Sequence, residues 1–89
     1  MDVKEKVEIF SRMYVIDILR AIHSGYNEAG RCCNKEKELR TQFSFLSYHN
    51  YRRIMKVLLQ NNFILRYGDI VRRTYKLNYD MININILEG

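Results

Sequence analysis

A change of apolar periodicity within residues 47–77 constrains the fold of this chain more than any other feature. Ser47 is a favourable helix N-cap residue, and the apolar residues after it recur three or four positions apart, as on one face of a helix. These apolar residues are Tyr51, Ile54, Met55, Leu58 and Leu59. The predicted outward face is polar and carries His49, Arg52, Arg53, Lys56 and Gln60. Asn61-Asn62 should end the helix, because Asn tolerates the left-handed backbone found there.

The pattern then changes to that of a β-hairpin. Phe63–Tyr67 and Ile70–Leu77 are predicted strands, and Gly68-Asp69 between them suits a tight two-residue turn. Side chains alternate between the two faces of a strand. On the second strand we therefore expect one face to carry Val71, Tyr75 and Leu77, and the other to carry Arg72, Thr74 and Lys76.

The first half of the chain is predicted to be helical. Residues 3–23 have the spacing of one helix, which Gly25 would end. Its predicted stripe is Val3, Val7, Phe10, Tyr14, Ile18 and Ile22, with Val15 and Leu19 alongside. After a loop over residues 25–34, Asn34 is expected to cap a second helix over Lys35–Ser44. The apolar pair Leu39 and Phe43 should face the core.

The order helix, helix, turn, helix, hairpin predicts an α+β winged helix-turn-helix, with three helices and a two-stranded β-hairpin wing. A chain of 89 residues makes one small domain, expected to span residues 1–79. Residues 80–89 form a C-terminal tail with two open alternatives. Its alternating Ile and Asn residues suit an extended segment, whereas Asp80 could cap a short helix.

The positive charge is concentrated in the predicted third helix and hairpin. Of a net charge of +5, residues 47–77 hold seven lysines and arginines and one acid, Asp69, whereas residues 1–46 are nearly balanced. A basic helix next to a basic hairpin favours a polyanion, most often a nucleic acid. The simpler alternative is a solvated basic face that binds nothing.

Four segments carry a family resemblance: residues 16–22, Leu46-Ser-Tyr48, residues 51–64 and Tyr75-Lys-Leu77. They resemble segments of the short archaeal winged-helix DNA-binding proteins, which include chromatin-associated proteins, transcription regulators and small viral proteins. Residues 16–22 (Ile-Asp-Ile-Leu-Arg-Ala-Ile) resemble the family's first helix, and Leu46-Ser-Tyr48 resembles the opening of its recognition helix. Residues 51–64 and Tyr75-Lys-Leu77 resemble the helix leading into the wing and the closing strand. The chain departs from the family at Glu38–Gln42, where a Thr-Arg-Ile-Met run is usual. The long C-terminal helix that dimerises the family's chromatin protein is not expected in the residues after the wing.

The resemblance and the charge pattern imply a sequence-dependent double-stranded DNA-binding protein, with its third helix in the major groove. Tyr48, His49 and Asn50 lie in the first turn, where such helices meet base edges, and Arg and Asn can pair bidentately with guanine and adenine. Cations elsewhere would contact phosphates, and Arg72 and Lys76 are the better candidates in the wing. The predicted DNA-binding residues are Ser47, Tyr48, His49, Asn50, Arg52, Arg53, Lys56, Arg66, Arg72, Arg73 and Lys76.

Other binding functions remain open from the sequence. Binding could be non-specific and chromatin-like, or the domain could be a protein–protein interaction module built on the same surfaces. RNA is a third possible ligand, although the stacking aromatic residues of an RNA-recognition sheet are not evident.

The sequence does not predict an enzyme, a cofactor or a small-molecule ligand. His23 and His49 have no partner at the spacing of a catalytic triad or a metal site, and there is no phosphate-binding Gly-rich loop. Cys32 and Cys33 lack a histidine at zinc-ligand spacing. They are expected to be loop thiols or, alternatively, to form a disulfide across a dimer.

We also expect a homodimer in the cytoplasm, or in the host cytoplasm if the chain is viral, associated with the nucleoid. The dimer contact is assigned to the broadly apolar first helix and to the tail residues Ile82, Ile84 and Ile86. No apolar run approaches the about 20 residues needed to span a membrane.

Overall fold

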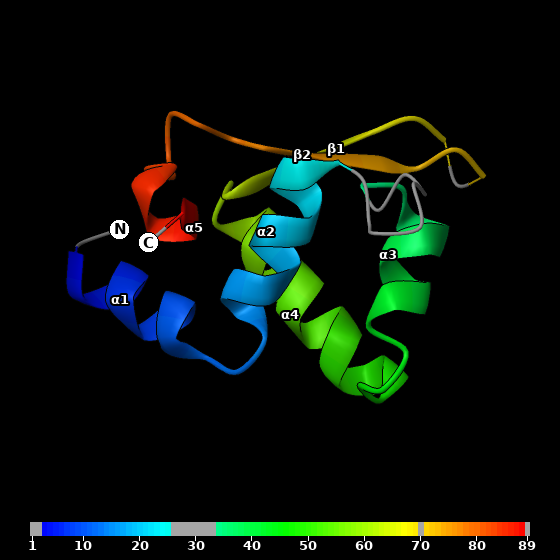
Figure 1. Ribbon diagram of the computed structural model, residues 1–89, viewed down its shortest axis with the longest axis horizontal. Coiled ribbons are helices and arrows are strands. Elements are labelled where there is room, and N and C mark those ends of the chain that lie inside the picture. The colour runs from blue at the N-terminus through cyan, green and yellow to red at the C-terminus, as the bar shows by residue number, and fades with distance from the viewer. Residues whose placement is uncertain (1–2, 26–33, 70, 89) are drawn as a thin grey trace.

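The structure, a computed structural model, describes residues 3–25, 34–69 and 71–88. Within these ranges, four helices precede a two-stranded antiparallel hairpin, and a short helix follows it (Figure 1). The chain is therefore α+β, with a winged-helix-like arrangement. The elements are α1 (Val3–Ser11), α2 (Val15–Ser24), α3 (Glu36–Gln42), α4 (Tyr48–Gln60), β1 (Ile64–Tyr67), β2 (Thr74–Leu77) and α5 (Asn85–Glu88).

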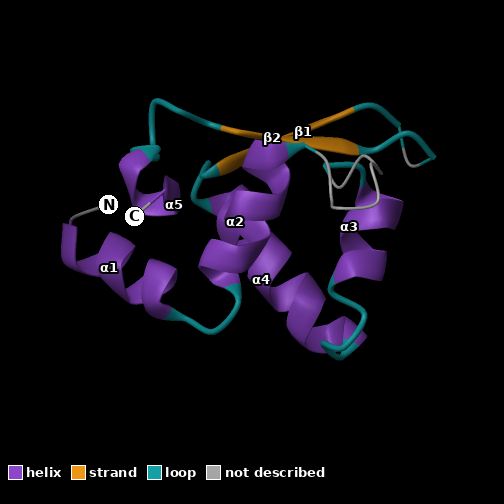
Figure 2. Cartoon of the chain, in the orientation of Figure 1, coloured by secondary structure: helices purple, strands orange, loops and turns teal. Residues whose placement is uncertain are grey.

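The hairpin lies along one side of the helices, and its strands pack on α2 and α4 (Figure 2). The fully buried side chains come from α2, α3, α4 and β1, and from Phe63 in the segment between α4 and β1. They include Ile18, Leu19, Leu39, Leu58, Phe63 and Ile64. Because one core joins the helices to the hairpin, the hairpin is held against α4, where the cationic residues lie.

The predicted single helix over residues 3–23 is wrong, because the chain turns between α1 and α2. Tyr14 has a φ of 67°, a left-handed conformation that ends a continuous helix. The turn lets α1 pack back against α2, whereas a straight helix would carry its first turns past the small core. Val3 and Val7, expected in the buried stripe, are 78% and 61% exposed.

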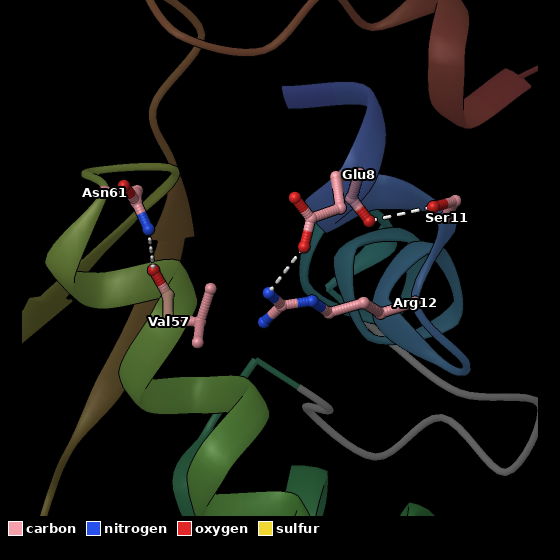
Figure 3. Close-up of polar contacts among 5 residues, drawn as sticks. All are labelled: Glu8, Ser11, Arg12, Val57 and Asn61. Atoms are coloured by element: carbon pink, nitrogen blue, oxygen red, sulfur yellow. Dashed lines mark hydrogen bonds and ion pairs between the residues drawn. The ribbon is translucent and has the colours of Figure 1, made fainter. Parts of the chain in front are cut away.

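Local side-chain bonds hold the end of α1 (Figure 3). The Ser11 hydroxyl donates to the Glu8 carbonyl at 2.8 Å, and Arg12 pairs with the Glu8 carboxylate at 3.2 Å. The Ser11 bond lies within the last turn of α1, and the Arg12 pair ties the first residue after the helix back to that turn. They are exposed, so they contribute little to stability, but they are consistent with the position of the helix end.

The predicted cap of the second helix is also wrong, because Asn34 pairs with the hairpin instead. The Tyr75 N–H donates to the Asn34 carbonyl at 2.8 Å, and Lys35 forms a β-bridge with Thr74. α3 starts at Glu36 without a side-chain cap and ends two residues before the predicted Ser44. The short segment before α3 thus pairs with the outer edge of β2, and this pairing satisfies backbone groups of both segments.

The predicted third helix is confirmed as α4. The Ser47 hydroxyl accepts a hydrogen bond from the Asn50 N–H at 3.1 Å, and Tyr51, Met55 and Leu58 are buried. At the other end the Asn61 side chain donates to the Val57 carbonyl at 2.8 Å (Figure 3). The left-handed residue expected at this end is Asn62, with a φ of 58°.

The hairpin has shorter strands and a longer connection than predicted. β1 and β2 pair in a register that sets Ile64 opposite Leu77 and Tyr67 opposite Thr74, so the predicted tight turn at Gly68-Asp69 is wrong. The Asp69 carboxylate accepts from the N–H groups of Val71 and Arg72 at 3.0 and 2.9 Å. This local capping favours a wide connection, so β2 starts only at Thr74. Val71, predicted to share a strand face with Tyr75, lies in the connection instead and is 91% exposed.

The C-terminal tail folds back onto its own domain. The chain turns at Tyr79–Met81 and ends in the short helix α5, which packs on α2. Ile82 and Leu87 are buried, and the Arg20 side chain donates to the Leu87 carbonyl at 2.7 Å. The helical alternative for the tail is therefore the closer one, although Asp80 does not cap the helix, which starts five residues later.

Candidate nucleic-acid interface

A polar ridge runs along the outward side of α4. The exposed residues His49, Arg53, Lys56 and Gln60 follow one another at intervals of three or four positions, opposite the buried Tyr51, Met55 and Leu58. Arg53 and His49 share a hydrogen bond of 3.2 Å between Nη2 and Nε2. Because the buried face fixes the rotation of the helix, the ridge must point to solvent.

A groove of about 970 Å³ lies between this side of α4 and the hairpin. We call it the basic groove. Its polar lining from α4 is Tyr48, His49, Arg52, Arg53, Lys56 and Gln60. The other elements add Arg66 and Tyr75 of the strands, Arg73 just before β2 and Glu36 of α3. The hydroxyl of the buried Tyr51 also belongs to the polar lining.

The charges in the basic groove are strongly unequal. Among the described residues that line it, five are lysine or arginine and one, Glu36, is a carboxylate. Two separate elements supply these cations, so their fields add along the same opening. Such a surface attracts anions over a distance of about 8 Å at physiological ionic strength.

The wing residues named from the sequence divide into two pairs. Arg66 and Arg73 line the basic groove with the α4 cations, whereas Arg72 and Lys76 are exposed outside it. The Lys76 ammonium instead lies 5.3 Å from the centre of the Tyr67 ring. The sequence analysis favoured Arg72 and Lys76 as the phosphate contacts of the wing, and these are the two residues that lie outside the basic groove.

The DNA-binding residues predicted at the start of α4 also differ in whether they line the basic groove. Ser47 uses its hydroxyl to cap the helix, and Asn50 is exposed but does not line the groove. Tyr48 lies at the start of the groove, with the guanidinium groups of Arg40 and Arg52 at 5.7 and 5.6 Å from its ring centre. These cation–π contacts restrict the orientation of an exposed aromatic side chain.

Arg40 was missed by the sequence reasoning. It donates to the carbonyls of Phe43 and Leu46, both at 3.0 Å, and its guanidinium lies 5.1 Å from the Tyr51 ring centre. It therefore holds the turn between α3 and α4. Its position in the last turn of α3, where Arg often bonds terminal carbonyls, was the available signal.

Glu36, in the first turn of α3, faces two buried tyrosines, Tyr51 and Tyr75. The Tyr51 hydroxyl donates to its carboxylate at 3.2 Å. Burial, followed by the charge of Glu36, raises the pKa of Tyr51 well above its ordinary value. The pKa of Tyr75 is also raised, first by burial and then by hydrogen-bonding and charge interactions with Glu36. Burial and the facing carboxylate thus favour the protonated hydroxyls, the form in which Tyr51 donates to Glu36.

The described residues contain no group of three or more His, Cys, Asp or Glu side chains placed to hold a metal ion. Cys32 and Cys33 lie outside the described residues. Within the described part of the chain, no helix has the length and apolarity to cross a membrane.

Comparison with known proteins gives no match to a family model, to a curated protein or to a solved structure.

Proposed function

We propose that the chain is a winged-helix protein that binds double-stranded DNA, with α4 as its recognition helix and the hairpin as its wing. The observation that carries the proposal is the convergence of five cations from α4 and the hairpin on one groove lined by a single carboxylate, as far as the described residues go. Duplex DNA presents two phosphate rows of high charge density, so cations on two neighbouring elements can engage one duplex together.

The ridge on α4 has the side chains needed to read bases as well as phosphates. The major groove is about 12 Å wide and admits a helix, and Arg and Gln can pair bidentately with guanine and adenine respectively. Arg53 and Gln60 lie on the same ridge, two helical turns apart. We therefore favour sequence-dependent binding by a transcriptional regulator over uniform coating of DNA.

A titration of folded protein against short genomic duplexes tests the proposal. We expect binding at low salt that weakens steeply as salt rises, with a log–log slope of up to about −4.5 if each groove cation meets one phosphate. Fluorescence anisotropy would measure both the affinity at low salt and its dependence on salt concentration. Folded protein that leaves every duplex unbound at low salt would refute DNA binding and favour a protein-interaction module.

Selection of bound duplexes from a random pool separates the two modes of DNA binding. A sequence-dependent regulator should enrich one motif, because each mismatched base pair typically costs about 1–3 kcal/mol. Recovery of an unchanged pool would instead identify a chromatin-like protein whose contacts are confined to the backbone.

We further propose that the protein acts as a homodimer joined through α1. Two recognition helices on one duplex reinforce each other through effective concentration. Burial of Ile82 within the domain takes this tail residue out of the expected contact, whereas Val3 and Val7 remain exposed on one side of α1. In Figure 1, α1 lies at the far end of the molecule from the tip of the hairpin, so pairing there leaves the basic groove open.

The double variant Val3→Gln/Val7→Gln should convert the dimer to a monomer without unfolding it, because both side chains are largely exposed. Light scattering at micromolar concentration would measure the mass, and Lys4→Gln on the same helix is the control expected to stay dimeric. A monomeric parent protein would rule out the dimer, and a dimeric double variant would rule out this contact.

A further inference from the structure

Glu36 lies where α3, α4 and the hairpin meet. Its N–H donates to the Arg73 carbonyl at 3.0 Å, directly before β2, and its carboxylate accepts from the Tyr51 hydroxyl of α4 at 3.2 Å. Two residues earlier in the chain, the Asn34 carbonyl accepts from the Tyr75 N–H at 2.8 Å. One short segment thus bonds the hairpin through its backbone and α4 through a side chain.

The charge of Glu36 opposes the charge of the surface that it lines. It is the only carboxylate among the described residues of the basic groove, and a negative charge there repels phosphate. Electrostatics alone would therefore favour a neutral residue at this position. The carboxylate therefore has a structural role, and the two tyrosines that face it indicate what that role is.

We propose that Glu36 is a positioning residue that sets the separation between α4 and the wing. Because its bonds connect the two elements, Arg66 and Arg73 are held at a fixed distance from Arg53 and Lys56, and all four can meet one duplex without rearrangement. Such preorganisation improves affinity by lowering the entropy lost on binding. This inference rests on the proposed DNA-binding function.

The variants Glu36→Ala and Glu36→Gln separate positioning from charge, since both remove the same negative charge. Glutamine retains an amide oxygen that can accept from Tyr51, whereas alanine does not. We expect Glu36→Ala to weaken duplex binding roughly five- to tenfold, the loss associated with one or two hydrogen bonds, and Glu36→Gln to bind at least as tightly as the parent. Equal or tighter binding by both variants would overturn the proposal.

Tyr51→Phe provides a test that leaves the charge of the groove unchanged and does not depend on the folding of Glu36→Ala. It removes only the hydroxyl that bonds Glu36, so positioning predicts weaker binding by folded protein. Unchanged affinity would contradict the role of this bond. Circular dichroism at the assay temperature establishes that each variant is folded.

The same substitutions in an Arg66→Ala/Arg73→Ala background identify what Glu36 positions. Once the wing cations are gone, Glu36→Ala should cause no further loss of affinity, because coupled residues are non-additive. A full additional loss would show that Glu36 acts elsewhere.

Amide hydrogen exchange tests the positioning role without DNA. In Glu36→Ala, the Tyr75 N–H should exchange faster than in the parent, because the segment that supplies its acceptor is less firmly held. An unchanged rate would overturn the positioning role. A parent protein that binds no duplex would refute the proposed function, while the exchange result would still decide whether Glu36 holds the hairpin.

Discussion

Replacing Arg53 and Lys56 together with alanine is expected to weaken duplex binding by roughly 10- to 100-fold. Both side chains are exposed on the α4 ridge and line the basic groove. Each contact to a phosphate or a base edge should contribute about 1 kcal/mol or more, and about 1.4 kcal/mol corresponds to a tenfold change in affinity. The log–log salt slope should also become shallower by about two units.

The control is Lys4→Ala/Lys6→Ala, which lowers the net charge by the same amount. Lys4 and Lys6 belong to α1, and neither lines the basic groove. This variant should bind nearly as the parent does, because screening limits the influence of distant surface charges. Equal losses in the two double variants would mean that net charge, and not the α4 ridge, governs binding.

Replacing Leu58 with alanine should destabilise the fold by roughly 2–5 kcal/mol, the range for well-buried leucines. Leu58 has 0% exposure, so the shorter side chain leaves a cavity in addition to losing apolar burial. For a domain of this size, each kcal/mol lowers the thermal midpoint by about 4–8 °C. Thermal unfolding followed by circular dichroism would measure the change.

Leu59→Ala is the matched control, because the neighbouring leucine is only half buried. It should cost clearly less, since less apolar surface returns to water. If the two variants lowered the midpoint equally, the buried face of α4 would be rotated from the one described. A Leu58→Ala midpoint equal to that of the parent would have the same meaning.

The sequence predicts the parts of this fold whose causes are local. The α4 helix begins at Ser47 because that side chain caps the Asn50 N–H, and it ends near a left-handed Asn62. Its buried face follows from helical spacing alone. The cationic ridge is predicted with it, because the residues opposite a buried stripe must face solvent.

The candidate site required contacts between segments that are distant in the sequence. Spacing within the hairpin indicated Arg72 and Lys76, but the docking of the hairpin on the core brings Arg66 and Arg73 beside α4. The sequence of α3 alone would place Glu36 among exposed acidic residues. Its hydrogen bond with the Tyr51 hydroxyl forms only because the fold brings α4 beside it.

Local pattern thus determined the helix that carries the cations, its faces and its N-terminal end. Tertiary structure alone decided the break at Tyr14, the pairing of Asn34 with Tyr75 and the set of cations that share one groove. The physical reason is the range of the interactions. Caps and helical periodicity act within a few residues, whereas a small core can bury its apolar surface only by folding α1 back and drawing the segment before α3 onto β2.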